Sequence, residues 1–157
     1  MRFLRALPAL LLIAAAPASR YTIDGAASEV SAKVAFFGVA SKTARFPGIT
    51  GGITLSPARP EAIDLTVTID ATTLTAPDKL TMTRLKGPRF FDVRRYPTIV
   101  FTGASMTMTG ERDAEIAGSI TARGVTRPAT LAVRFTEPPL RSAGRRPLAL
   151  DGETVID

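Results

Sequence analysis

The chain has 157 residues, which is enough for one domain with a hydrophobic core, and its formal net charge at pH 7 is +6. It contains no Cys, His, Trp, Asn or Gln. The absence of Cys and His excludes zinc sites built on thiolate or imidazole, and it excludes nucleophilic systems that need a Ser-His or Cys-His pair. Carboxylate-only Mg²⁺ or Ca²⁺ sites are not excluded by composition, but the sequence has no D-x-D-x-D loop and no acidic cluster.

The first 18 residues have the pattern of a secretory signal peptide. Arg2 and Arg5 give a positively charged start, residues 7–16 are apolar, and Ala16-Pro17-Ala18 fits the small-x-small cleavage rule. We predict cleavage after Ala18, which leaves residues 19–157 as one secreted domain. An uncleaved anchor is the alternative, although a membrane-spanning helix needs roughly 20 apolar residues. No Cys follows the cut, so a lipoprotein anchor is excluded.

Removal of residues 1–18 lowers the formal net charge from +6 to +4, because this segment holds two Arg and no acidic residue. The remaining cations are spread along the chain in ones and twos, which permits loose attraction to an anionic membrane surface. The aromatic residues are few and do not alternate with basic runs, so we expect no nucleic-acid partner. A secreted chain without cysteine must be stabilised by core burial alone.

Short segments with alternating apolar and polar residues predict that the mature chain is mostly β-strand. The first such segment is 29–36, the clearest is 63–70, and others are 98–108, 115–123 and 130–136, with 148–156 as the start of one more. Glycines at 48, 51 and 52 interrupt a strand pattern that resumes at residue 53, which indicates a bulge or a sharp bend. Strands at roughly ten-residue spacing without long helices between them are typical of an all-β sandwich or barrel.

Residues 77–92 interrupt the β pattern and predict a short helical cap over one end of the sheet. Pro77 and Asp78 are typical of a helix start, and Gly87-Pro88 of a helix end. The apolar residues between and after them fit one or two helical turns; they are Leu80, Met82, Leu85 and Phe90. Met82, Met106 and Met108 fit either an adaptable surface at the mouth of a barrel or gap-filling positions in a core.

Two motifs in the second half of the chain resemble signatures of the YceI-like family, which are bacterial lipocalin-like barrels that bind polyisoprenoids. The motifs are F-F-D-V-R-R-Y-P-T-I-V-F (residues 90–101) and G-S-I-T-A-R-G-V-T-R-P-A-T-L (residues 118–131). Weaker matches are Tyr21-Thr22-Ile23-Asp24, the segment 45–49 and Thr68-Ile69-Asp70. Ala27 stands where the family usually has His, so a role for that His does not carry over.

The C-terminal residues 152–157 resemble the start of the family's penultimate strand. Two explanations remain open, namely a truncated sequence or a version without the closing strand. A missing strand would leave two sheet edges with unpaired backbone groups. Aggregation, a homodimer formed by edge pairing, or a leaky pocket would follow.

The resemblance implies an all-β fold, an antiparallel lipocalin-like β-barrel with a short helical cap, that lacks its C-terminal closing strand in the second of these cases. It also implies a periplasmic, non-enzymatic protein that holds a polyprenol or an isoprenoid quinone in its lumen, with no metal and no other cofactor. The inferred inward-facing residues include Ile63, and the predicted lipid-binding residues are Val30, Val34, Phe36, Ile53, Leu55, Leu65, Val67, Ile69, Leu85, Phe90, Ile99, Phe101, Ile116, Ile120, Leu131, Val133 and Phe135. The predicted contacts with a lipid head group are Arg84, Arg89, Arg94 and Arg95; a solvated charged face is the alternative.

Two other functions are compatible with the same residues. The alternating apolar positions also fit a structural β module with an ordinary filled core, because a core and an apolar cavity share one pattern. An enzyme that uses Asp92 or Tyr96 as acid or base is the second alternative. The absence of His, Cys, Asn and Gln weakens it, because few catalytic or oxyanion-stabilising groups remain.

Overall fold

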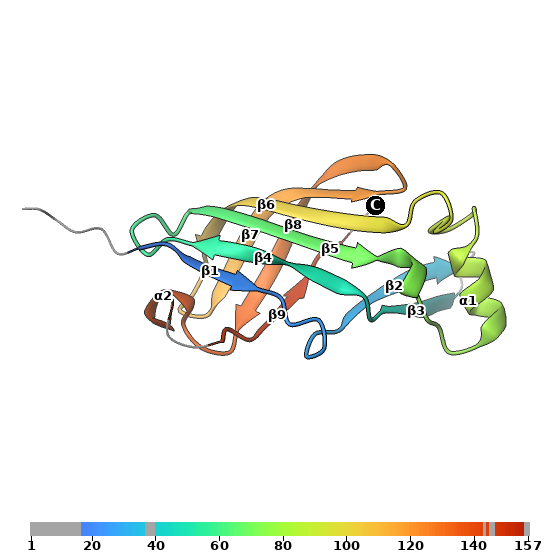
Figure 1. Cartoon of the computed structure of the whole chain (residues 1–157), viewed down its shortest axis with the longest axis horizontal. Helices are drawn as coiled ribbons and strands as arrows, with labels where there is room; N and C mark the ends of the chain where they lie inside the picture. Colours follow the sequence, from blue (N-terminus) through green and yellow to red (C-terminus); the bar gives the residue numbers. More distant parts are fainter. Residues whose placement is uncertain (1–16, 37–39, 143, 145–146, 156–157) are drawn as a thin grey trace, which may run out of the picture.

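The structure is a computed structural model that describes residues 17–36, 40–142, 144 and 147–155. They form a curled antiparallel sheet, with a two-stranded hairpin and a short helix at one end (Figure 1). Residues 1–16 of the predicted signal peptide lie outside the described residues. The first strand, β1 (Ser19–Thr22), begins directly after the predicted cleavage position, and the cleavage itself stays a prediction.

Seven strands form the main sheet in the order β1-β4-β5-β6-β7-β8-β9, and every neighbouring pair is antiparallel. After β1 the members are β4 (Ile49–Leu55), β5 (Ala62–Asp70), β6 (Thr98–Met108), β7 (Asp113–Ala122), β8 (Val125–Phe135) and β9 (Leu150–Glu153). In β5, Ile63 and Leu65 are buried while Asp64 and Thr66 are exposed, which is the two-residue period expected of a strand with one face on a core. The predicted all-β fold with a helical cap is confirmed.

The sheet curls into a half-barrel because its strands bend at irregular positions. Register shifts interrupt the β5–β6 pairing between Ala62 and Leu65, and the β6–β7 pairing between Gly103 and Ser105. The glycines of β4 predicted a bulge or a sharp bend there; a bulge is absent from the β4–β5 pairing, which keeps a continuous register from Ile49 to Thr54. The distortion in β4 is confined to Gly51, whose φ of 145° is accessible to glycine.

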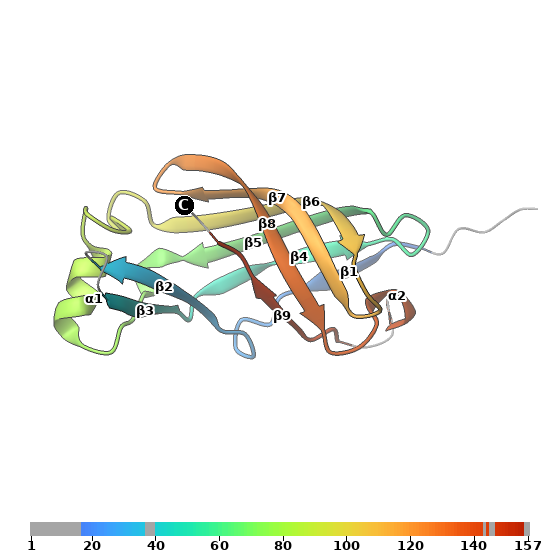
Figure 2. The same ribbon diagram turned by 180° about the vertical axis from the view of Figure 1, so that it is seen from behind.

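The hairpin of β2 (Val30–Phe36) and β3 (Ala40–Phe46) forms a separate two-stranded sheet beside the cap. The sequence pattern predicted β2 but not β3, because β3 begins with exposed residues and only its last three positions show a buried alternation. Arg45 and Thr75 exchange two backbone hydrogen bonds, with N···O distances of 3.0 and 2.9 Å. The Phe46 ring also packs edge-on against Phe91, with ring centroids 5.3 Å apart. These contacts attach the hairpin to the cap segment (Figure 2).

The cap helix α1 (Lys79–Lys86) has the predicted start and end signals. The carboxylate of Asp78 accepts hydrogen bonds from the backbone N–H and the hydroxyl of Thr81, at 2.8 and 2.7 Å. These two bonds, the backbone bond first, hold the pKa of Asp78 below its ordinary value because they favour the charged carboxylate. Gly87 ends the helix, and the fully buried Leu85 anchors it to the core.

The β7–β8 connection is tighter than the sequence pattern predicted. Arg123 and Gly124 have φ values of 52° and 73°, and Ala122 pairs directly with Val125. Two successive residues with positive φ form the two-residue turn that suits a β-hairpin. β8 therefore begins at Val125, five residues before the predicted start at residue 130.

Candidate functional site

The predicted lumen residues share the inner face of the curled sheet, the hairpin and the cap. Every one of them whose side chain is described belongs to one hydrophobic cluster or packs against it. Nine are buried in the cluster: Leu55, Leu65, Leu85, Ile99, Phe101, Ile116, Ile120, Val133 and Phe135. Seven are half-buried at its margin: Val30, Val34, Ile53, Val67, Ile69, Phe90 and Leu131. The side chain of Phe36 lies outside the described residues.

The two groups have different capacities for a ligand. The nine buried residues occupy the space between the strands with their own side chains, together with neighbours such as Phe46 and Met106. The half-buried group keeps part of its apolar surface exposed, and it includes branched aliphatic side chains from β2, β4, β5 and β8. The cap contributes Phe90 to the same margin. The candidate site is therefore this set of half-buried side chains at the margin of the cluster, here called the apolar strip, and lipid binding by these residues stays a prediction.

Several core residues were not predicted from the sequence. Ala44 and Phe46 are 0% and 1% exposed and come from β3, where only the last three positions alternate between buried and exposed. Leu74 and Val93 are buried in turns, where no periodic pattern marks them. Met106 is 2% exposed, so it is a core residue, whereas Met82 and Met108 pack at the margin of the cluster.

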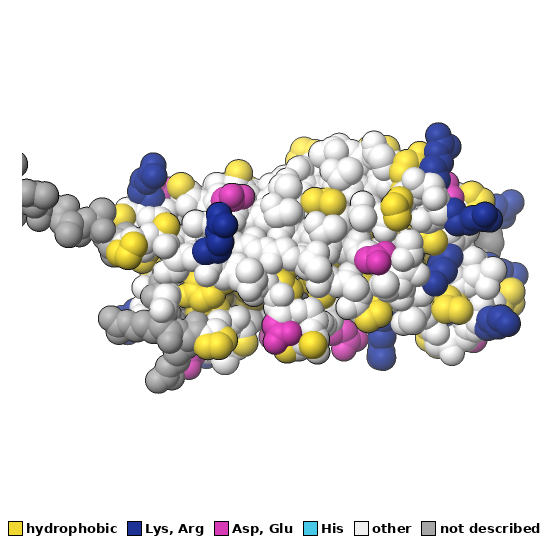
Figure 3. All heavy atoms as spheres, viewed as in Figure 1, with side chains coloured by type: hydrophobic (Ala, Val, Ile, Leu, Met, Phe, Trp, Pro, Cys, Tyr) yellow, Lys and Arg dark blue, Asp and Glu magenta, His cyan; other side chains and the backbone are white. Residues whose placement is uncertain are grey.

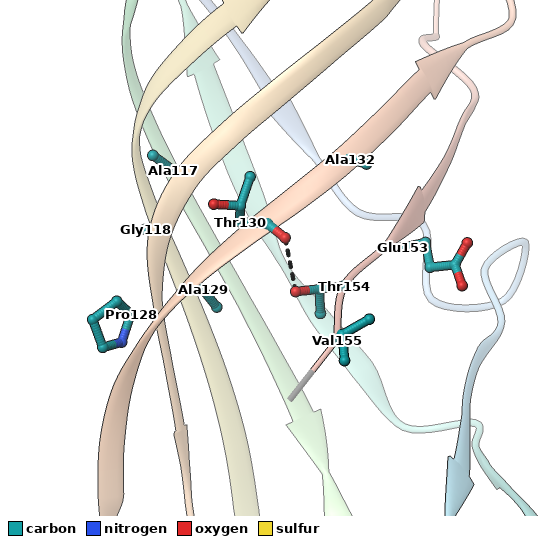
Figure 4. Close-up of a pocket in the computed structure, with 9 residues that line it drawn as sticks. All are labelled: Ala117, Gly118, Pro128, Ala129, Thr130, Ala132, Glu153, Thr154 and Val155. Carbon is teal, nitrogen blue, oxygen red and sulfur yellow. Dashed lines mark hydrogen bonds between the residues drawn. The ribbon is translucent and has the colours of Figure 1, made fainter. Parts of the chain in front are cut away.

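A separate open groove of about 600 Å³ lies along β7, β8 and the segment that follows β9 (Figure 4). The hydroxyl of Thr154 donates a 2.8 Å hydrogen bond to the carbonyl oxygen of Thr130, which holds this segment against β8. The groove is lined mostly by small side chains and includes none of the predicted lumen residues; its residues are Ala117, Gly118, Pro128, Ala129, Thr130, Ala132, Glu153, Thr154 and Val155. Its volume is in the range of ligand pockets, but it is open to solvent and Glu153 is its one charged lining residue.

The four arginines predicted to meet a head group lie together around α1 and the loop after it. All four side chains are exposed, and none of them forms a salt bridge within the described part of the chain. The guanidinium of Arg95 lies over the ring of Tyr96, 5.4 Å from its centroid. Figure 3 shows Lys and Arg side chains gathered at the end of the molecule that α1 occupies.

Asp92 and Tyr96, the residues of the enzymatic alternative, have structural positions in the loop after α1. Asp92 has a φ of 45°, and its carbonyl oxygen accepts hydrogen bonds from the backbone N–H groups of Arg95 and Tyr96 at 3.0 and 2.8 Å. The Tyr96 ring packs against Gly124 of the β7–β8 turn. In residues 17–36, 40–142, 144 and 147–155, no three carboxylates come together as a group that could hold a metal ion.

Most of the chain matches one known protein family. The sequence profile of the YceI-like domain matches residues 21–157. The chain belongs to the YceI-like family. A UPF0312 protein of Pseudomonas putida (strain GB-1) is 30% identical over 129 residues, which cover 81% of this chain and 67% of that protein. A UPF0312 protein of Ectopseudomonas mendocina (strain ymp) is 30% identical over 122 residues, which cover 76% of this chain and 64% of that protein.

Solved structures share the fold of this YceI-like chain. BcnA of Burkholderia cenocepacia superposes with a TM-score of 0.59 at 18% identity, over 76% of this chain and 69% of that chain. The YceI protein of Campylobacter jejuni superposes with a TM-score of 0.56 at 23% identity, over 74% of this chain and 68% of that chain. The predicted lipocalin-like barrel architecture is therefore confirmed. Proteins of this family are not known as enzymes, and the name UPF0312 states no activity.

Proposed function

We propose that this YceI-like protein is a non-enzymatic carrier that holds a long isoprenoid lipid, such as a polyprenol or an isoprenoid quinone, against the inner face of its half-barrel. The observation that carries the proposal is the apolar strip of half-buried side chains on that face, including Val67 and Leu131. These side chains are aliphatic and branched, as isoprenoid units are. The backbones of β5 and β8, which carry Val67 and Leu131, are already hydrogen-bonded to neighbouring strands. A bound apolar chain would therefore leave no backbone polar group of these strands without a partner.

The expected affinity follows from the burial of hydrocarbon. Each methylene removed from water contributes about 0.8 kcal/mol, so ten of them contribute roughly 8 kcal/mol before losses. Immobilisation of the flexible chain takes back several kcal/mol. A ligand of several isoprene units that lies along the strip therefore reaches roughly micromolar affinity or better.

The proposal places the protein in the periplasm, with residues 1–18 removed before it folds. β1 begins at Ser19, directly after the predicted cut. No helix in the described part of the chain is long and apolar enough to cross a membrane. Intact-mass measurement of protein from a periplasmic fraction tests the location. The expected mass is that of a chain that begins at Ser19. The mass of the uncleaved chain in the membrane fraction would contradict the cleavage.

Native mass spectrometry of protein purified from a bacterial periplasm tests ligand binding. We expect an additional mass that matches a polyprenol or an isoprenoid quinone, and saturable binding of the same lipid by delipidated protein. No co-purifying lipid and no saturable binding would contradict the proposal. Turnover of an isoprenoid substrate that disappears in Asp92→Ala, while lipid binding survives, would favour the enzymatic alternative.

Variants separate the inner face from the groove on β7 and β8. Val67→Gln and Leu131→Gln each place an amide on the apolar strip, and a polar group buried there without a partner costs about 1–3 kcal/mol, so isoprenoid affinity should fall about tenfold or more. Thr107→Gln on the exposed face of β6 is the control and should leave affinity unchanged. Ala132→Gln narrows the groove. A loss of binding in Ala132→Gln alone would place the lipid in the groove and contradict the inner-face site.

A further inference from the structure

We propose that the end of the molecule around α1 docks on the surface of a bilayer that contains anionic phospholipid. This docking end consists of α1, the loop 87–97 and the β7–β8 turn at residues 123–125. The inference goes beyond lipid carriage, because docking depends on the outer surface of this end and needs no occupied inner face.

Two exposed large hydrophobic residues mark the docking end. Leu80 on α1 is 62% exposed, and Val125 at the start of β8 is 55% exposed. Leu80 and the fully buried Leu85 are five positions apart, so the anchoring of Leu85 in the core turns Leu80 toward solvent. Leu80 lies four residues before Arg84, and residues at this spacing share one helix face. The solvent face of α1 therefore presents an aliphatic side chain beside a cation.

Specific contacts bring the β7–β8 turn to the same end as α1. The guanidinium of Arg123 donates a hydrogen bond of 3.0 Å to the carbonyl oxygen of Pro88. A Cβ at Gly124 would lie 2.9 Å from the ring of Tyr96, so the turn and the loop after α1 are in close contact. Figures 1 and 2 show the turn and α1 at one end of the molecule. Leu80 and Val125 therefore belong to one end.

The charge of the docking end is strongly positive and is not neutralised locally. The segment 78–97 has six basic residues and two acidic ones. Neither acid is in a salt bridge within the described residues; Asp78 caps α1 with its carboxylate, and the backbone carbonyl of Asp92 forms a tight turn. The six basic residues are Lys79, Arg84, Lys86, Arg89, Arg94 and Arg95, and none of them is in a salt bridge within the described residues.

Charged residues elsewhere in the described structure are arranged differently. Arg134 pairs with Asp113 at 3.6 Å, and Arg141 lies 4.0 Å from Glu111, so the far ends of β7 and β8 carry mixed charge. The cations of the docking end are therefore concentrated on one side. An anionic lipid surface attracts each cation near it by about 1 kcal/mol, and exposed aliphatic residues add the apolar contact that an interfacial helix makes. A soluble polyanion would use the cations but would gain nothing from Leu80.

Flotation of the mature protein with vesicles tests the docking end. The vesicles contain phosphatidylcholine alone or phosphatidylcholine with about one third phosphatidylglycerol, a fraction chosen to give an anionic surface, and they contain no isoprenoid. Binding to the anionic vesicles that weakens with salt is expected. Equal binding to both vesicle types, or to neither, would overturn the proposal. Because isoprenoid is absent, this result is independent of the lipid-carrier function, which the titration of delipidated protein tests separately.

Matched variants locate the contact. The triple variant Arg84→Gln, Arg89→Gln and Arg94→Gln should lower the partition coefficient about a hundredfold, at about fivefold for each cation near the surface. The control triple Arg20→Gln, Arg59→Gln and Arg112→Gln removes the same charge from exposed positions outside the docking end. The partition coefficient of the control triple should stay about tenfold or more above that of the docking-end triple. Equal effects of the two triples would overturn the proposal, because they would show dependence on net charge alone.

Leu80→Ser tests the apolar contact, with Leu150→Ser on β9 as the control. Leu80→Ser should lower partitioning about threefold or more, since it removes an apolar side chain from the interface, while Leu150→Ser should not. The same proteins are titrated with inorganic polyphosphate, and thermal unfolding confirms that each variant is folded. Tight polyphosphate binding together with no effect of Leu80→Ser would identify a soluble polyanion site and overturn the bilayer proposal.

Discussion

The hydroxyl of Tyr21 accepts a 2.6 Å hydrogen bond from the backbone N–H of Gly144. Tyr21 lies on β1, at one edge of the seven-stranded sheet, and Gly144 precedes β9, at the other edge. A Cβ at Gly144 would lie 2.8 Å from the hydroxyl oxygen of Ser19, so the two segments are in direct contact. β1 and β9 do not pair with each other among the described residues. The bond therefore helps to fix the curl where no ladder of hydrogen bonds does.

Tyr21→Phe removes this hydrogen bond and leaves the ring in place. The free energy of unfolding should fall by about 1 kcal/mol, the usual net contribution of one hydrogen bond. Urea denaturation measures the change. Hydrogen exchange should show that the substitution speeds exchange in β9 more than in β5, relative to the wild type. Tyr96→Phe is the control, because the Tyr96 hydroxyl has no hydrogen-bond partner in the described structure. An equal loss of stability in both variants would show that the Tyr21–Gly144 bond has no particular role.

Leu85→Ala should detach the cap helix from the core. Leu85 is 0% exposed, and removal of a buried leucine side chain typically costs about 2–5 kcal/mol through lost burial and an empty cavity. Leu80→Ala on the same helix is the matched control. Leu80 is 62% exposed, so its replacement should change the free energy of unfolding by less than about 0.5 kcal/mol. Denaturation of both variants measures the difference. Similar losses of the free energy of unfolding would contradict the burial of Leu85 and the exposure of Leu80.

Gly118→Ala should disturb the bend of the sheet. A Cβ at position 118 would overlap the carbonyl oxygen of Thr102 on the neighbouring β6 strand, so one of the two strands must shift. Overpacking of this kind costs about 1–3 kcal/mol or more. Gly110→Ala in the β6–β7 connection is the control, because the nearest atom to its Cβ would be a side-chain oxygen of Asp113 at 3.2 Å and no backbone atom would be overlapped. Thermal unfolding should separate the two variants, and equal melting temperatures would show that the close approach at Gly118 is relaxed.

The strongly patterned parts of the fold could be predicted from the sequence. The sequence pattern predicted β5 and β6, which span nine and eleven residues, and buried residues on them such as Leu65 and Phe101. The cap helix was predicted because Asp78 and Gly87 are chemically specific end signals. The family resemblance supplied the barrel, since alternation alone does not distinguish a sandwich from a barrel.

The remaining elements depend on contacts that the local sequence does not contain. β3 is held by pairing with β2 and by the Arg45–Thr75 backbone bonds, although most of its own residues are polar. The sequence pattern predicted a break between strands after Arg123, but not a two-residue turn, because arginine is uncommon at positive φ. Exposure could not be predicted either. Val67 and Leu65 have equivalent places in the alternation, but only Leu65 is buried, because the curl of the sheet covers one and leaves the other at the margin.

The Asp78 cap makes the stability of α1 depend on pH in the acidic range. Hydrogen bonds from the Thr81 backbone and hydroxyl lower the pKa of Asp78 in the folded protein. A carboxyl group with a lowered folded pKa stabilises the fold above its unfolded pKa, which is about 3.9. That stabilisation is lost as the pH falls through the lower folded pKa. Asp78→Asn keeps an oxygen acceptor at the cap but does not titrate.

The melting temperature of the wild type should therefore exceed that of Asp78→Asn above about pH 5, and the difference should shrink steadily as the pH falls and the Asp78 carboxylate becomes protonated. Asp78→Ala, which has no acceptor, should melt below both at neutral pH. Calorimetry between pH 2 and pH 7 measures the three curves. A difference between wild type and Asp78→Asn that stays constant down to pH 2 would show that the charge on the cap contributes nothing to the stability of the helix.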